Sequence, residues 1–173
     1  MKYHQSIIIL PVVLVSLLPT VADGQTKQNR FQNTLTGADK CLDIINDGNN
    51  NRPTMAKCGN IPGQRWIISA SKPNRKFYRL KTPFTGADKC LNVVDDGERN
   101  KLVMDKCDNV SGQRWSIVPS KENPGYSGYY LLKNELTGQD KCLDVIDDGR
   151  NNRLTIAECS QVSGQSWKIN KAP

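Results

Sequence analysis

The chain contains three consecutive copies of one sequence unit, and this repeat limits its possible folds more than any other feature. A segment of 31 residues recurs at 36–66, 85–115 and 137–167. The first and second copies are identical at 18 of 31 positions without a gap, and so are the second and third. Because a unit of this size cannot bury its own apolar face, we expect the three units to close around a shared core.

Each unit has the pattern of four short β-strands and shows no helical periodicity of useful length. A strand-like lead-in comes first, at 31–35, 77–84 and 129–136. A β-branched run follows at 41–45, 90–94 and 142–146 and leads to an Asp-Gly turn. We predict a third strand that ends at the second cysteine of the unit and a fourth that begins at Gln64, Gln113 or Gln165. The chain is therefore expected to be all-β, and three four-stranded units favour a threefold barrel over a propeller, which needs at least four blades.

Residues 1–24 have the pattern of a secretory signal peptide. An apolar stretch runs from residue 7 to residue 18, and small residues precede a cleavage point after Ala22 or Gly24. Crossing a bilayer takes about 20 apolar residues. This stretch is shorter and is interrupted by Pro11, so it is not expected to span a membrane. No second hydrophobic stretch follows, so we expect residues 25–173 to form a secreted, extracellular domain with no membrane span.

The mature domain is expected to contain no histidine, because the single His4 lies in the leader. This excludes Ser-His-Asp catalysis, Cys-His catalysis and His-ligated zinc. Residues 43–48 match a calcium loop only in part, since Ile45 and Thr54 stand where oxygen ligands belong. We therefore expect no enzyme activity, no metal and no cofactor.

The two cysteines of each unit are 17 residues apart, which gives six in all. An even number in an exported chain indicates disulfides rather than metal ligands or reactive thiols. The equivalence of the units leaves pairing within a unit, or rotationally symmetric pairing between units. We favour pairing within the unit, because its two cysteines flank a hairpin. The favoured pairs are Cys41–Cys58, Cys90–Cys107 and Cys142–Cys159.

Each unit ends in a Gln-x-Trp triplet and carries Cys-Leu-(Asp/Asn) upstream. Three such combinations, covering essentially the whole mature chain, resemble the ricin B-type lectin repeat. The resemblance implies a β-trefoil of three repeats of about 50 residues, at about 29–70, 76–119 and 128–171. It also implies that each Gln holds a loop backbone and that the tryptophans are core residues, and one large ring per unit independently favours packing over ligand stacking. These tryptophans are Trp66, Trp115 and Trp167.

In that family the Asp directly after Cys-Leu accepts hydrogen bonds from two sugar hydroxyls. Asp43 and Asp144 match this residue, whereas the second unit has Asn92. A carboxylate can accept from both hydroxyls of a vicinal diol, while an amide offers a single acceptor atom. The resemblance therefore implies sugar-binding candidates in each unit, and the second unit's pair is the weakest of them. The pairs are Asp43 with Gln64, Asp144 with Gln165, and Asn92 with Gln113.

Two parts of the family's sugar pocket are missing from this sequence. Glycine stands where the family has an Asn before the Gln, at Gly63, Gly112 and Gly164. The aromatic platform two residues before the second cysteine is replaced by Ala56, Asp105 and Ala157. Apolar contact with a ring contributes much of the affinity of a shallow sugar site. If a ring is needed, the candidates to supply it from an adjacent loop are Phe84, Tyr126, Tyr129 and Tyr130.

Four polar positions recur in all three units and allow two interpretations. Asp and Asn often hydrogen-bond their own backbone in tight turns. Alternatively, loop 46–52 and its counterparts face a ligand beside Asp43 and Asp144, in a different pocket. The recurring positions are Asp39/Asp88/Asp140, Lys40/Lys89/Lys141, Asp47/Asp96/Asp148 and Asn51/Asn100/Asn152.

Five cations lie between Ser71 and Lys81, in a chain of formal net charge +7. This segment is either a polyanion site for sulfated or acidic glycans, or a strand edge that its charge keeps from pairing. Nucleic acid is not an expected partner for an exported protein with so few aromatic residues.

The sequence thus predicts a secreted, lectin-like protein that binds glycans, galactoside-like or acidic, at several sites and without catalysis. The missing aromatic platform favours one alternative of another class. This is a disulfide-stapled trefoil that binds a protein partner, as an inhibitor, an effector or a toxin-associated subunit. An enzyme would need carboxylates such as Asp47 and Asp96 to meet in one cleft, whereas threefold symmetry places them on separate lobes.

Overall fold

A computed structural model of the chain describes residues 27–45, 48, 52–72, 75–97, 100–120, 128–160 and 162–173. The predicted signal peptide, 1–24, lies outside the described residues. Within them, no helix is long and apolar enough to cross a membrane.

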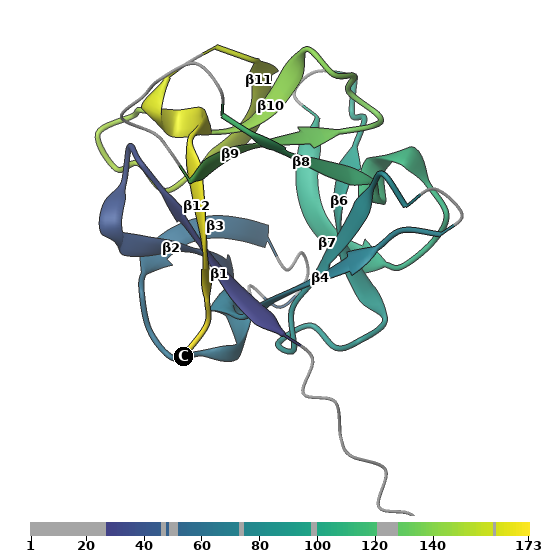
Figure 1. The fold of residues 1–173 in the computed structure, drawn as a ribbon, viewed down its shortest axis with the longest axis horizontal. Helices are drawn as coiled ribbons and strands as arrows, with labels where there is room; N and C mark the ends of the chain where they lie inside the picture. Colours follow the sequence, from purple (N-terminus) through teal and green to yellow (C-terminus); the bar gives the residue numbers. More distant parts are fainter. Residues whose placement is uncertain are drawn as a thin grey trace, which may run out of the picture.

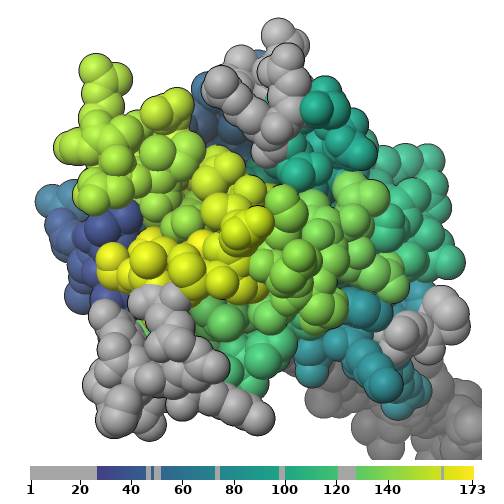
Figure 2. Space-filling model, turned by 90° about the horizontal axis from the view of Figure 1, so that it is seen from above, coloured from purple at the N-terminus to yellow at the C-terminus, as the bar shows by residue number. Residues whose placement is uncertain are grey.

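Six strands, two from each unit, form a closed barrel. They follow one another around the barrel in the order β1-β4-β5-β8-β9-β12, and β12 pairs with β1 to close the ring. Figure 2 shows β12 in yellow lying between the N-terminal strand in purple and β9 in green. Closure leaves the barrel without a free edge. The barrel strands are β1 (Gln28–Asn33), β4 (Trp66–Ala70), β5 (Tyr78–Lys81), β8 (Trp115–Pro119), β9 (Tyr129–Asn134) and β12 (Trp167–Lys171).

The other two strands of each unit form an antiparallel hairpin, and Figure 1 shows the three units as three lobes around a common centre. A six-stranded barrel with three hairpins, built from three repeats, is a β-trefoil. The all-β, three-repeat fold expected from the sequence is therefore confirmed. The hairpin strands are β2 (Gly37–Ile45) with β3 (Arg52–Lys57), β6 (Lys89–Val94) with β7 (Lys101–Lys106), and β10 (Lys141–Val145) with β11 (Leu154–Glu158).

One disulfide closes each hairpin, and the predicted pairing within the unit is confirmed. In the first unit, Cys41 lies in β2 and Cys58 directly follows β3, and their Cα atoms are 5.0 Å apart. The other two disulfides have the same Cα separation and the same place in their units.

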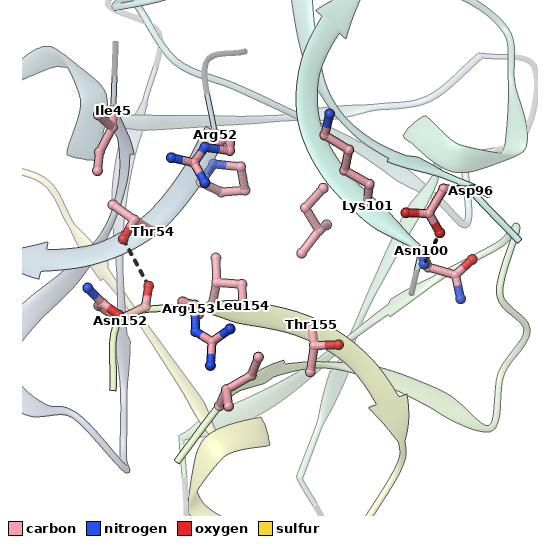
Figure 3. Close-up of a pocket in the computed structure, with 13 residues that line it drawn as sticks. Ile45, Arg52, Thr54, Asp96, Asn100, Lys101, Asn152, Arg153, Leu154 and Thr155 are labelled. Carbon is pink, nitrogen blue, oxygen red and sulfur yellow. Dashed lines mark hydrogen bonds between the residues drawn. The ribbon is translucent and has the colours of Figure 1, made fainter. Parts of the chain in front are cut away.

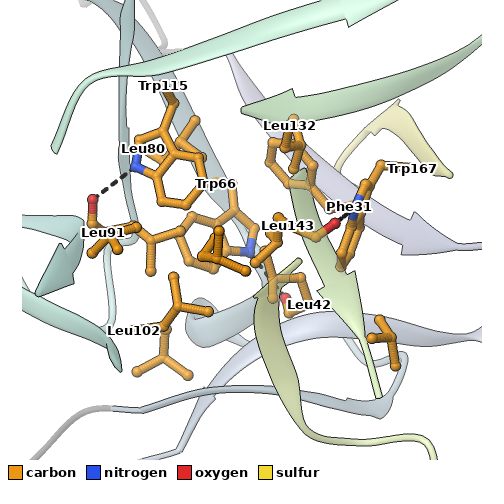
Figure 4. Packing of buried hydrophobic residues seen from close by; sticks show 14 of the residues in the cluster. Phe31, Leu42, Trp66, Leu80, Leu91, Leu102, Trp115, Leu132, Leu143 and Trp167 are labelled. Carbon is orange, nitrogen blue, oxygen red and sulfur yellow. Dashed lines mark hydrogen bonds between the residues drawn. The ribbon is translucent and has the colours of Figure 1, made fainter. Parts of the chain in front are cut away.

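The three tryptophans have no exposed surface and pack together inside the barrel (Figure 4). Each indole N–H donates to the carbonyl oxygen of the leucine that follows the first cysteine of its own unit. These N···O distances are 2.9 Å to Leu42, 2.9 Å to Leu91 and 3.0 Å to Leu143. The hydrogen bond that satisfies each buried indole N–H thus links the barrel to the hairpin of the same unit.

The fourth strand of each unit differs from the prediction at its first residue. It begins at the Trp, and the Gln instead ends a short 3₁₀ turn, in η1 (Pro62–Gln64), η2 (Ser111–Gln113) and η4 (Ser163–Gln165). The turn lets the Gln face the hairpin while the Trp, two residues later, faces the core. Local strand propensity does not predict this change of direction.

For the strand within segment 71–81, β5 (Tyr78–Lys81), the interpretation as an uncovered strand edge is wrong. β5, which carries Arg79 and Lys81, pairs with β4 on one side and β8 on the other. These two side chains donate to carbonyl oxygens, Arg79 to Asp108 at 2.9 Å and Lys81 to Ala87 at 3.0 Å. Ring closure of the barrel, which a linear pattern does not reveal, covers this strand on both sides.

Buried asparagines join neighbouring units. The Asn33 Nδ2 donates to the Gly164 carbonyl at 2.8 Å, and the Asn134 Nδ2 donates to the Gly112 carbonyl at the same distance. The Oδ1 of each Asn accepts the backbone N–H two residues later, at 3.0 Å. The second unit has Thr82 at the equivalent position, where its Oγ1 accepts the Thr85 N–H at 3.4 Å. The turn after the first barrel strand is thereby held against a neighbouring unit.

Replacing Asn134 by Ala should lower the free energy of unfolding by about 2–3 kcal/mol, because the Gly112 carbonyl and the Leu136 N–H lose buried partners. Asn134→Thr is the matched control, since Thr82 holds the equivalent turn through one hydrogen bond, which its Oγ1 accepts from the N–H three residues later. It should cost about half as much. Urea denaturation of both variants tests this, and equal losses would show that the amide donor contributes nothing.

Candidate functional site

Two of the three units bring a carboxylate and a glutamine amide together. Asp43 lies in β2, and its Oδ2 accepts a hydrogen bond from the Gln64 Nε2 at 3.0 Å. In the third unit, the Asp144 Oδ2 accepts from the Gln165 Nε2 at the same distance. The structure therefore brings together two of the three pairs of residues that the sequence singled out.

The glutamine of each pair uses its whole amide inside the protein. The second N–H of Gln64 donates to the Lys57 carbonyl at 2.9 Å, and its Oε1 accepts the Gly59 N–H at 2.7 Å. Gln165 makes the equivalent bonds to Glu158 and Ser160. With both N–H donors engaged and the side chain buried, the Gln positions the carboxylate and holds the loop after the hairpin.

The carboxylates keep acceptor capacity that the described residues do not use. The Asp43 Oδ1 accepts the Ile44 N–H at 2.7 Å, so two hydrogen bonds occupy a group that offers about four acceptor positions. Asp43 is 7% exposed, and Asp144 is more open to solvent. Burial raises the pKa of Asp144 above its ordinary value, and the hydrogen bonds from Gln165 and the Val145 N–H partly offset this effect.

The glycine before each Gln leaves room for this carboxylate. A Cβ at Gly63 would lie 2.3 Å from the Asp43 Oδ1, and one at Gly164 would lie 2.2 Å from the Asp144 Oδ1. Both distances are far below van der Waals contact. The carboxylate thus occupies the space that a side chain at this position would need, which explains why glycine stands there.

The second unit has a different site. Gln113 keeps its bonds to the Lys106 carbonyl and the Asp108 N–H, but among the described residues the Asn92 Oδ1 has no hydrogen-bond partner. The Asn92 Nδ2 is 3.5 Å from the Asp105 Oδ2, and Asp105 occupies the position of the missing aromatic platform. An amide in place of the carboxylate therefore breaks the link to the Gln.

An exposed apolar side chain stands beside each site, and the sequence analysis did not single it out. Ile61 is 45% exposed, Val110 43% and Val162 47%, and each directly precedes the 3₁₀ turn that carries the Gln. The available signal was an aliphatic residue at the same position of every unit. Of the candidate rings, Phe84 is 39% exposed, Tyr129 and Tyr130 lie in barrel strand β9, and Tyr126 lies outside the described residues.

Two of the recurring polar residues, Asp96 and Asp148, make turn contacts, whereas the Lys40 Nζ donates to the Arg150 carbonyl of the third unit at 2.9 Å. The Asp148 Oδ1 accepts the N–H groups of Arg150 and Asn151, and the Asp96 Oδ1 accepts the Asn100 N–H. Loop 46–52 itself lies largely outside the described residues. Its counterparts do border a pocket, but neither Asp43 nor Asp144 lines it.

The close packing of glycine against the carboxylate can be tested with a matched pair of variants. Gly63→Ala should lower the free energy of unfolding by about 1–3 kcal/mol, because the new methyl group displaces the Asp43 carboxylate. Gly59→Ala in the same loop should be nearly neutral, since its nearest neighbour would be 3.8 Å away. Chemical denaturation compares the two, and an equal effect would contradict the packing argument.

The raised pKa of Asp144 predicts a pH dependence of stability. A carboxyl group whose pKa is higher in the folded than in the unfolded state stabilises the fold below its unfolded pKa of 3.8, and this contribution is lost as pH rises through the folded value. Relative to Asp144→Asn, the wild type should therefore lose unfolding free energy as pH rises from 3.5 to 6. Urea denaturation at each pH measures this. If the unfolding free energies of wild type and Asp144→Asn change equally with pH, the raised pKa of Asp144 is contradicted.

Comparison with known proteins supports the family suggested by the motifs. The family model of the ricin-type beta-trefoil lectin domain matches residues 27–128. No match was found among curated proteins.

Solved structures show the same fold at low sequence identity. The designed threefold-symmetric protein ThreeFoil has a TM-score of 0.66 at 18% identity, over 83% of this chain and 98% of that one. A mosquitocidal holotoxin has a TM-score of 0.70 at 18% identity, over 86% of this chain but 18% of that one. An exo-beta-1,3-galactanase from Clostridium thermocellum has a TM-score of 0.66 at 18% identity, over 86% and 31%. Because the family model covers more than half of the residues and the fold agrees with it, the chain belongs to the ricin-type β-trefoil lectin domain family.

Proposed function

We propose that this protein is a secreted, non-catalytic lectin whose first and third units bind glycans. One observation carries the proposal: the same carboxylate–glutamine pair, with unused acceptor positions, stands in both units. Two free acceptor positions on one rigid carboxylate match two neighbouring hydroxyls of a sugar ring. The glutamine fixes the carboxylate in place before the ligand arrives, which reduces the ordering cost of binding.

The apolar part of each site comes from aliphatic side chains in this proposal. Ile61 in the first unit and Val162 in the third are exposed and lie two residues before the glycine that packs on the carboxylate. A sugar ring has an apolar face that such a side chain can cover, although with less area than an indole offers. We therefore expect weak individual sites.

In this proposal, the Phe84 ring provides an additional contact to a sugar bound at the first unit's site. By the repeat, Phe84 corresponds to Leu35 and Leu136. The Leu35 N–H donates to the Ser163 carbonyl of the third unit, which places that turn beside the third unit's site. The equivalent turn with Phe84 belongs beside the first unit's site, where a 39% exposed ring could contact a sugar.

Two weak sites on separate lobes would act together on a surface dense in glycans. When two sites engage one surface, the second binding event is intramolecular and the apparent affinity rises by orders of magnitude. The proposal includes no catalytic step, because glycoside hydrolysis needs two carboxyl groups flanking one bond, whereas Asp43 and Asp144 lie in different hairpins. Three closed disulfides agree with an exported protein.

A glycan array with the disulfide-bonded protein tests the function. We expect binding to neutral galactosides or similar sugars that persists at moderate salt. The Asp43→Asn/Asp144→Asn double variant should reduce this binding at least tenfold, because both sites then resemble the second unit.

The matched control is Asp39→Asn/Asp140→Asn, which removes the same charge from exposed residues at equivalent positions of the same two units. It should bind as the wild type does. Unchanged binding in the first double variant would overturn the site assignment. No binding to any glycan would overturn the function and favour a protein partner.

A further inference from the structure

A pocket of about 410 Å³ lies where the three hairpins meet, on the axis that relates the units. Its lining comes from the ends of β2 and β3, from β7 and the turn before it, and from β11 and its turn (Figure 3). The Thr54 Oγ1 donates to the Asn152 carbonyl at 2.9 Å and so ties two of the hairpins together beside it. Pockets of this volume are typical of small-molecule sites.

Three equivalent apolar side chains line this axial pocket, one from each unit. They are Pro53, Leu102 and Leu154, each near the start of the second strand of its hairpin. Pro53 and Leu102 are buried and Leu154 is partly buried. These residues provide a hydrophobic surface that can contact a sugar-sized ring.

Three equivalent cations precede these apolar residues in the sequence and also line the pocket. Arg52 and Lys101 are the first residues of β3 and β7, and Arg153 directly precedes β11 (Figure 3). The repeat therefore places one positive side chain per unit around the axis. Two of the three are arginines, whose guanidinium groups bind oxyanions through paired hydrogen bonds.

The carboxylates near the pocket only partly balance these cations. Asp96 lines the pocket, and its Oδ1 accepts the Asn100 N–H at 3.0 Å. Asp148 contacts Arg153 at 2.8 Å, and this hydrogen bond lowers the pKa of Asp148 to about 2, so it is charged at neutral pH. The Arg153 side chain remains 62% exposed and keeps donors available. Among the described residues, the lining therefore carries three cations and one carboxylate, and Asp148 outside the lining offsets part of the charge of Arg153.

We propose that the axial pocket binds a ring-sized ligand bearing two or more oxyanion groups, such as sulfates or phosphates. The ring contacts Pro53, Leu102 and Leu154, and the oxyanions contact the three cations around them. This site is additional to the proposed neutral-sugar sites, because neither Asp43 nor Asp144 lines it. It gives the protein a second specificity, for charge.

The probes are a disulfated disaccharide, the same disaccharide without sulfate, and inositol hexakisphosphate. Isothermal titration calorimetry at 50 and 300 mM salt should show binding of the disulfated sugar that weakens with salt, and at least tenfold weaker binding of the unsulfated one. Arg52→Gln/Lys101→Gln/Arg153→Gln should weaken the binding of the disulfated sugar at least tenfold.

The matched control is Lys57→Gln/Lys106→Gln/Lys168→Gln. It removes the same net charge from exposed lysines outside the pocket, two of them at the far ends of β3 and β7. This variant should bind the disulfated sugar within about threefold of the wild type, which separates a pocket from general attraction to a basic protein. Circular dichroism and thermal melting show that both triple variants remain folded.

A second variant tests the pocket without removing a cation. Asp96→Asn should tighten binding of the disulfated sugar about threefold or more, since it removes the one lining carboxylate while its amide oxygen can still accept the Asn100 N–H. Binding of inositol hexakisphosphate as well shows that the site recognises oxyanions on any ring, whereas binding of the sulfated sugar alone identifies an acidic glycan. Equal weakening in the two triple variants, no effect of Asp96→Asn, or binding of neither anionic probe would overturn the proposal.

Discussion

The three-way hydrogen bonding of the buried glutamines is the interaction on which the rest of the structure depends. One amide group holds the end of a hairpin strand, the loop that follows it and, in two units, the carboxylate of the candidate site. It also ends the turn that delivers the Trp into the core, where the indole N–H bonds the same hairpin from the inside. The Gln and the Trp of each Gln-x-Trp segment thus both fix the hairpin to the barrel.

Threefold repetition produces two kinds of surface with different properties. Each lobe carries its own lateral site, so a single substitution, such as Asn92 for Asp, changes one site and leaves the others intact. The axial pocket instead takes one cation and one apolar side chain from every unit. One cation per unit therefore becomes three cations around one space.

Much of the fold could be predicted from the sequence because the repeat contains it three times. Spacing and residue type predicted the hairpins and the burial of Trp66, Trp115 and Trp167, and they favoured cysteine pairing within the unit over symmetric pairing between units. The candidate carboxylates could be named through motif resemblance, but their contacts could not. The role of Gly63 became clear only from its packing against Asp43. That β5 is an inner barrel strand and not an edge strand became clear only from its pairing with both β4 and β8.

The sequence by itself determined the unit: its strands, its disulfide and the residue types at each recurring position. These are local properties, since they depend on residues within about 30 positions of one another. The tertiary structure alone decided which residues of different units meet. Arg52, Lys101 and Arg153 are about 50 residues apart in sequence, and only closure of the barrel about a common axis brings them around one pocket.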